Sequence, residues 1–147
     1  MNRKLSSDTW EAMMRAHATM MRCFQEAGNW KTVSMREYDV LYTLAKAGCS
    51  MNQKALLEGV LLSQPALSRL LNRLIEQGLI ERGEDPADGR GILIRLTEKG
   101  REVQRQVGRI HAETIAQRLG ATLSEHDMNT LRTLALAIAK GPRDDGR

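Results

Sequence analysis

The sequence predicts a mainly α, α+β fold in which several helices accompany one β-hairpin. Three observations support this prediction. Apolar residues recur at steps of three and four along most of the chain, which is the helical period. The segments with this period begin near Ser, Thr or Asp and stop near Gly, as helices do. The pattern becomes strand-like only in two short runs, residues 79–82 and 91–96.

The composition excludes several classes of protein. The chain has 147 residues, 41% of them apolar, which is too apolar for intrinsic disorder and long enough to bury a core. No apolar run approaches the roughly 18–20 residues of a membrane span, and no hydrophobic segment of a secretory signal follows the basic N-terminus. Cys23 and Cys49 cannot form a disulfide framework. We therefore expect a cytoplasmic protein without membrane contact.

The charge balance is modestly basic. Lys and Arg total 22 against 18 Asp and Glu, a net charge of +4. Such an excess is compatible with a polyanionic partner, although only the placement of the charges can identify one. Aromatic residues make up 3% of the chain, which argues against a surface that binds single-stranded nucleic acid by stacking.

The first helix is expected from Asp8, a candidate N-cap, to Gly28, a candidate stop. Its apolar face would be rich in methionine and consist of Trp10, Met13, Met14, His17, Met20, Met21 and Phe24. Because Met repacks easily, this face could serve as an adaptable ligand surface. Packing in a core or against a second subunit is the favoured interpretation.

The next two helices begin at capping signals. Ser34 and Glu37 have the spacing of a capping box, in which each side chain bonds the other residue's main-chain N–H. The helix that follows should end at Gly48. Its buried face is predicted to consist of Tyr38, Leu41, Tyr42 and Ala45. Residues 50–53 offer a second capping signal before a short helix that ends at Gly59.

A further helix begins four residues after Gly59. Ser63 is its candidate N-cap, Pro65 lies in the first turn, where its missing N–H costs nothing, and Gly78 ends the helix. Its buried face is predicted to consist of Leu67, Leu70, Leu71, Leu74 and Ile75. Two short helices joined by a tight turn form a helix-turn-helix.

A β-hairpin is predicted directly after this motif. Residues 79–82 and 91–96 would be its strands, and the turn-forming residues between them, 84–90, predict an extended polar tip. A hairpin in this position is a wing.

The rest of the chain predicts two more helices. Thr97 is the candidate N-cap of a helix that reaches about Leu119, roughly 33 Å long at about 1.5 Å per residue. Ser124 and Asp127 have capping spacing at the start of the last helix, which Gly141 ends. Residues 142–147 are expected to be a flexible tail.

The polar face of the helix after Ser63 is the first candidate site. Hydrogen-bonding and cationic side chains lie toward its N-terminal end, the end with which a recognition helix reads bases in the major groove of double-stranded DNA. The candidate residues are Ser63, Gln64, Pro65, Ser68, Arg69, Asn72 and Arg73. The alternative is a solvated face on which Arg69 or Arg73 pairs with Glu76. The turn before this helix and the wing after it favour contact with DNA.

The hairpin tip is the second candidate site. Arg90 is predicted to enter a minor groove, where a narrow groove concentrates negative potential. Asp88 would hold its guanidinium in position through a charge-assisted pair. The alternative is an ordinary exposed arginine.

Residues 62–100 resemble the MarR family of winged-helix transcription regulators. Four motifs match in order and spacing: Ser68-Arg69, Gly-Leu-Ile-Glu-Arg at 78–82, Asp-Pro-Ala-Asp-Gly-Arg at 85–90, and Leu-Thr-Glu-Lys-Gly at 96–100. A weaker helical match extends over almost the whole chain.

The resemblance implies a homodimeric repressor that binds a pseudo-palindromic operator. Its recognition helix would occupy the major groove through Gln64, Ser68, Arg69 and Arg73, and its wing would place Arg90 in the minor groove. Residues 1–33 and 97–141 would form a helical dimerisation region, and 34–96 the winged helix-turn-helix. The resemblance also implies a small aromatic or anionic effector that releases the DNA.

A dimer is favoured on physical grounds as well. The first helix and the last two have more apolar surface than a winged core of about 65 residues can cover. A two-fold dimer would cover these faces and space two recognition helices by about one turn of DNA, 34–36 Å.

The sequence gives little support to other chemistry. Cys23 beside Phe24 favours a buried, inert thiol over a peroxide sensor, and Cys49 has only Lys46 nearby to activate it. We expect a packed His17, a surface His111 and no metal site, because the histidines are scattered over separate elements.

Other classes of function are less well supported. No catalytic constellation or phosphate loop is present in the sequence, so neither an enzyme nor a cofactor is expected. A winged helix used only for protein contact and a cysteine-based redox-sensing regulator stay open as alternatives.

Overall fold

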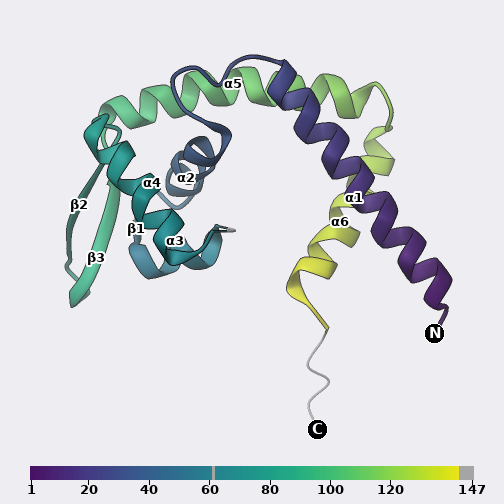
Figure 1. Ribbon diagram of the computed structural model, residues 1–147, viewed down its shortest axis with the longest axis horizontal. Helices are drawn as coiled ribbons and strands as arrows, with labels where there is room; N and C mark the ends of the chain where they lie inside the picture. The colour runs from purple at the N-terminus through teal and green to yellow at the C-terminus, as the bar shows by residue number, and fades with distance from the viewer. Residues whose placement is uncertain (61, 143–147) are drawn as a thin grey trace, which may run out of the picture. The chain divides into compact units, whose positions relative to one another are not determined.

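The computed structural model describes residues 1–60 and 62–142 and confirms the mainly helical α+β fold (Figure 1). These residues form, in order, α1 (Arg3–Glu26), α2 (Met35–Lys46), β1 (Ser50–Asn52), α3 (Gln53–Gly59), α4 (Gln64–Glu76), β2 (Ile80–Asp85), β3 (Asp88–Leu96), α5 (Glu98–Gly120) and α6 (Glu125–Lys140). The predicted tail, apart from Pro142, lies outside the described residues.

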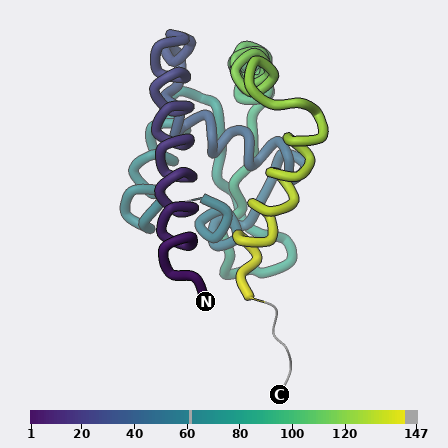
Figure 2. Tube along the Cα trace, turned by 90° about the vertical axis from the view of Figure 1, so that its right-hand side faces the viewer, coloured from purple at the N-terminus to yellow at the C-terminus, as the bar shows by residue number. Residues whose placement is uncertain are grey.

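The chain divides into two compact units, one made of Met1–Met20 and Ala112–Arg147 and the other of Met21–His111. In the first unit, the N-terminal part of α1 and the helix α6 run close to one another (Figure 2) and line a hollow of about 420 Å³ with Leu5, Trp10 and Ile138. No helix of the described residues is long and apolar enough to cross a membrane.

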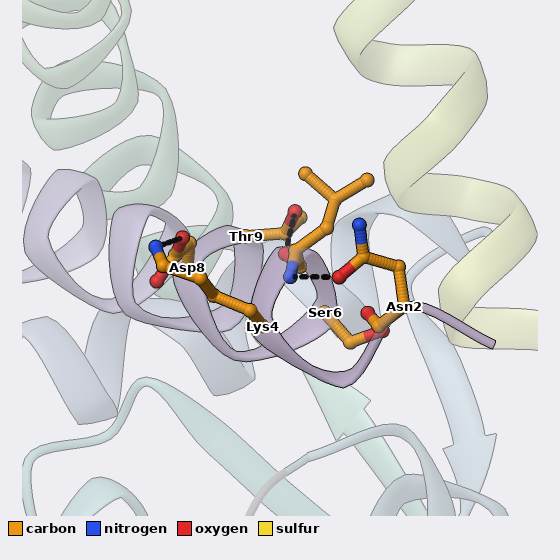
Figure 3. A network of polar contacts seen from close by, with 6 residues as sticks. Asn2, Lys4, Ser6, Asp8 and Thr9 are labelled. Atoms are coloured by element: carbon orange, nitrogen blue, oxygen red, sulfur yellow. Dashed lines mark hydrogen bonds and ion pairs between the residues drawn. The ribbon is translucent and has the colours of Figure 1, made fainter.

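Helix α1 begins before the predicted N-cap. Asn2 caps it, since the Asn2 Oδ1 atom accepts a hydrogen bond from the main-chain N–H of Leu5 at 3.0 Å (Figure 3). Asp8 lies inside the helix, where its carboxylate pairs with Lys4 Nζ at 2.7 Å. The prediction that Asp8 is the N-cap was wrong because the first turns are polar and extend the helix beyond the apolar period.

Three of the other capping predictions agree with the structure. Ser34 Oγ accepts from Glu37 N at 3.1 Å and Glu37 Oε1 accepts from Ser34 N at 3.4 Å, which completes the capping box. Ser124 and Asp127 make the same exchange at the start of α6. Ser63 Oγ accepts from Ala66 N at 3.4 Å and caps α4.

The sheet contains a strand that the sequence did not predict. The strand order of the sheet is β1-β3-β2, and neighbouring strands are antiparallel. Met51 of β1 pairs with Ile94 of β3. Residues 50–53 are therefore not simply a helix start. Asn52 alone caps α3, by accepting from Lys54 N at 2.8 Å, and Ser50 belongs to the strand.

The hairpin has a tighter tip than predicted. Strand β2 extends to Asp85 and β3 starts at Asp88, so only Pro86 and Ala87 separate them. Asp85 Oδ1 accepts a hydrogen bond from Ala87 N at 2.9 Å and closes the turn. Cross-strand pairing thus continues through residues whose types alone indicate a loop.

The described core lies in the Met21–His111 unit and joins α2, α3, α4 and the sheet. Its members include Val40, Leu41, Leu44, Leu56, Leu67, Leu70, Leu71, Leu74, Leu79, Ile80, Ile94 and Leu96. Four of the five residues predicted for the buried face of α4 are buried, and the fifth, Ile75, is partly buried against the core. Tyr42, predicted to be buried, is 44% exposed. Helices α1 and α6 contain no buried residue.

Candidate nucleic-acid interface

Helix α4 presents one apolar and one polar face. Leu67, Leu70, Leu71 and Leu74 are buried, and this fixes the opposite face toward solvent. The side chains of Ser63, Gln64, Pro65, Arg69, Asn72 and Arg73 are exposed, and that of Ser68 is half-buried. The candidate residues of this helix are therefore accessible to a partner along its whole polar face.

A hollow of about 430 Å³ lies on the polar face of α4. Its polar lining is Arg69, Asn72 and Arg73 from α4 together with Arg36 from the first turn of α2. Leu62, Ala66 and Leu70 form its apolar walls. Arg36 was missed by the sequence analysis because nothing in its own segment distinguishes it from any exposed helical arginine.

The arginines of this hollow are electrostatically uncompensated. Across residues 1–60 and 62–142, no carboxylate lies within ion-pair distance of Arg36, Arg69 or Arg73, so the alternative pairing with Glu76 is not formed. Elsewhere on the surface Arg95 pairs with Glu81 at 3.5 Å and Arg105 with Glu102 at 3.7 Å. The hollow is therefore a concentration of positive charge.

Asn72 is held by a residue of the wing. Arg82 Nη1, on β2, donates a hydrogen bond to Asn72 Oδ1 at 3.1 Å. This bond joins the polar face of α4 to the hairpin. Arg82 is a second residue that the sequence analysis did not assign, because its partner lies on another element.

The base of the wing tip is fixed by polar contacts. Asn52 Nδ2 donates to Asp85 Oδ2 at 3.0 Å. That bond, with the main-chain N–H of Ala87, holds the pKa of Asp85 below its usual value. The strand β1 thereby anchors the turn at which the two long strands of the hairpin meet.

Arg90 and Asp88 lie near the tip but not as predicted. Arg90 is an exposed residue of β3 and not of a flexible loop. Asp88 Oδ1 accepts a hydrogen bond from the main-chain N–H of Arg90 at 3.1 Å, in place of the predicted pair with its guanidinium. The carboxylate is used in shaping the strand start, and the Arg90 guanidinium is left for a partner.

His111 belongs to an aromatic cluster and is not the surface residue predicted from the sequence. Its ring lies 4.6 Å from that of Phe24, 5.2 Å from that of Trp30 and 5.6 Å from that of Tyr38, each edge to face. Burial lowers the pKa of His111. His17, predicted to be packed, is exposed in the single chain.

Because burial lowers the pKa of His111, the free energy of unfolding should fall as the pH drops below about 6.5, the ordinary pKa of histidine. The folded state favours neutral His111, so the unfolded state binds more protons and stability rises with pH across this window. Thermal unfolding of the protein and of His111→Phe between pH 8 and about pH 5 measures the effect. The variant should lose this part of the pH dependence, and His126→Gln, in an exposed position of α6, should retain it. Parallel curves for the protein and His111→Phe would contradict the assignment.

Comparison with known proteins identifies the family. A family model described as MarR family matches residues 32–91. An HTH-type transcriptional regulator of Mycobacterium bovis is 31% identical over 132 residues, which cover 90% of this chain and 88% of that protein. The chain belongs to the MarR family.

Two solved structures show the same fold. A MarR family transcriptional regulator from Streptomyces coelicolor, in complex with DNA, is 20% identical in sequence and superposes with a TM-score of 0.82. The match covers 99% of this chain and 92% of that protein's chain. BpsR of Bordetella bronchiseptica, whose DNA binding is regulated by 6-hydroxynicotinic acid, is 19% identical and superposes with a TM-score of 0.78. The match covers 90% of this chain and 98% of the BpsR chain. MarR-family proteins are transcriptional regulators, which supports a role other than catalysis for this chain.

The two cysteines of this MarR-family chain are half-buried. Cys49 has a φ of +75° directly after Gly48 at +86°, and its carbonyl accepts from Leu96 N at 2.9 Å. Its main chain thus links the end of α2 to the sheet. Among the described residues, no group of three or more His, Cys, Asp or Glu is placed to hold a metal ion.

Proposed function

We propose that this MarR-family regulator is a repressor that binds a pseudo-palindromic operator in double-stranded DNA as a homodimer. The polar face of α4 would lie in the major groove, where Gln64, Ser68, Arg69, Asn72 and Arg73 reach base edges or phosphates and the capped start at Ser63 and Pro65 faces the backbone. Arg90 of the wing, with Asp88 shaping its strand, would enter the adjacent minor groove.

One observation carries this proposal. The exposed face of α4 holds Arg69 and Arg73 with no carboxylate partner among the described residues, although other arginines of the chain are paired. Unpaired cations on an accessible helix face, beside a hairpin with a further exposed arginine, suit a polyanion better than solvent. Since operators lie on the chromosome, we expect a cytoplasmic location.

The proposed dimer rests on apolar surface that the single chain leaves uncovered. Leu131, Leu134 and Ile138 of α6 are 52%, 58% and 61% exposed. In the same compact unit, Leu5 and Trp10 of α1 are 61% and 60% exposed. Several large apolar side chains exposed in one unit are typical of an interface, and a second copy is the partner that a palindromic operator requires.

A small aromatic or anionic effector is also proposed, because it would account for release from DNA. The support is the regulation of BpsR by 6-hydroxynicotinic acid.

Selection of bound duplexes from a random library tests the proposal. We expect enriched sites with two inverted halves centred about 10–10.5 bp apart, which only a two-fold dimer can select. Binding should weaken steeply as salt rises from about 50 to 200 mM, since each phosphate contact releases a counterion. Absence of binding at about 50 mM salt would contradict the proposal and favour a winged helix used for protein contact.

A further inference from the structure

We propose that the hollow between α2 and α4 seats one phosphodiester group of the bound duplex. Arg36, Arg69, Arg73 and Asn72 would bind it, and Arg82 would position Asn72. This inference rests on the proposed DNA binding and adds two residues outside the recognition helix, Arg36 and Arg82, to which the sequence analysis assigned no contact with DNA. It assigns a sequence-independent contact to the part of α4 that lines the hollow with Arg36 of α2.

The first argument is the orientation of the Asn72 amide. A guanidinium has donors only, so the group of Asn72 that faces Arg82 must be the carbonyl oxygen. The 3.1 Å bond from Arg82 Nη1 to Asn72 Oδ1 therefore leaves the Asn72 amide nitrogen, with both of its N–H donors, for another partner. Asn72 thus offers mainly donors to the hollow that it lines.

The second argument is that the whole polar lining is of one kind. Three guanidinium groups and the Asn72 amide offer donors, and none of the described carboxylates lines the hollow. Base edges in the major groove mix donors and acceptors, whereas the two unesterified oxygens of a phosphodiester only accept. Arginine forks also match the geometry of phosphate oxygens. The lining therefore suits a phosphate better than a base.

The third argument is electrostatic. Arg36, Arg69 and Arg73 come from two helices and surround a space of about 430 Å³, and none has an ion-pair partner in the described part of the chain. Their like charges repel each other in the free protein, and an anion in the hollow would offset this repulsion by attracting all three groups. Leu62, Ala66 and Leu70 exclude water from one side, which strengthens the attraction.

The test compares Arg36→Ala with the unchanged protein on a random-sequence duplex of roughly 30 bp, a probe that needs no operator. Loss of one phosphate contact should reduce the slope of log K against log salt by about 0.9 per subunit. Affinity should fall roughly tenfold at low salt, the usual effect of a lost charged hydrogen bond. The preferred sequence in a library selection should not change. Arg105→Ala is the matched control. Arg105 is already paired with Glu102, so its removal should leave the slope unchanged.

Neutral methylphosphonate groups then locate the contact. Placed singly along a duplex recovered from the library selection, which fixes the register of the protein, one at the contacted phosphate should weaken binding of the unchanged protein and have a smaller effect on Arg36→Ala. Arg82→Ala should weaken binding severalfold, and it should have no further effect in an Asn72→Ala background, as a positioning residue requires. Thermal unfolding of each variant checks that the fold is retained.

The outcomes separate the two proposals. If the unchanged protein shows no salt-dependent binding, the proposed DNA-binding function fails. If it binds and Arg36→Ala keeps the full slope, only the phosphate site is overturned. Inorganic phosphate provides the last comparison. One outcome is that phosphate raises the unfolding temperature more than chloride does at equal ionic strength, with this effect lost in Arg36→Ala. If in that case no methylphosphonate weakens DNA binding, the hollow binds a free anion and the proposed DNA contact is overturned.

Discussion

Gly100→Ala is expected to lower the free energy of unfolding by about 3 kcal/mol or more, at the upper end of the usual cost of overpacking. A Cβ at this position of α5 would lie 1.9 Å from the carbonyl oxygen of Leu79. That oxygen belongs to the main chain and accepts a hydrogen bond from Thr97 N at 3.1 Å. Neither atom can move without separating α5 from the start of the hairpin.

The control lies in the same helix. Nothing stands within 4 Å of a Cβ built on Gly120, the last residue of α5, so Gly120→Ala should leave stability unchanged or raise it slightly. Chemical denaturation of both variants measures the difference. A midpoint for Gly100→Ala equal to that of the unchanged protein would mean that α5 and Leu79 do not approach each other in solution as they do here.

Gly100 illustrates what the sequence can and cannot predict. Its place after Leu96 and Thr97 is part of a recognisable motif, but the motif does not say why glycine is needed there. The reason is a contact between main-chain segments 21 positions apart, Leu79 and Gly100. Capping at Ser34 and Ser124 could be predicted in full, because each involves residues within one helical turn.

Two of the features that could not be predicted are set by distant segments. Strand β1 has three residues, and its local signals are those of a helix start, yet Met51 pairs with Ile94. His111 has the polarity of a surface residue, and its ring neighbours come from three other segments. Local pattern does not contain such information, because packing between segments overrides local preference.

The same reasoning explains the outcome at the candidate interface. The exposed polar face of α4 could be predicted, because burial of four leucines at helical spacing determines it. The contribution of Arg36 could not, since it depends on how α2 packs beside α4. The direction of the Asp88 carboxylate also differed, because Oδ1 accepts a hydrogen bond from the main-chain N–H two residues further along, that of Arg90.

Arg90→Ala is expected to weaken binding to nearly all duplex sequences, and Arg69→Ala is expected also to relax the preference at one base pair by about 1–3 kcal/mol. The reason is the type of group that each arginine would meet. Arg90 lies on the wing and would respond to the negative potential of a minor groove, which most sequences offer to some degree. Arg69 lies on the exposed face of α4, where its five N–H donors allow it to bond two acceptors of a guanine in addition to the phosphate of the hollow.

Selection from a random library, carried out in parallel with both variants and Arg95→Ala, separates the two roles. Arg95 shares strand β3 with Arg90, but its charge is paired with Glu81 at 3.5 Å, so its removal should change neither affinity nor preference appreciably. If Arg69→Ala weakened all sequences equally and kept the preference, Arg69 would contact phosphate alone, and base reading would fall to Gln64 and Ser68. If both variants bound as tightly as the unchanged protein, the uncompensated charges of α4 and the wing would have another partner than DNA.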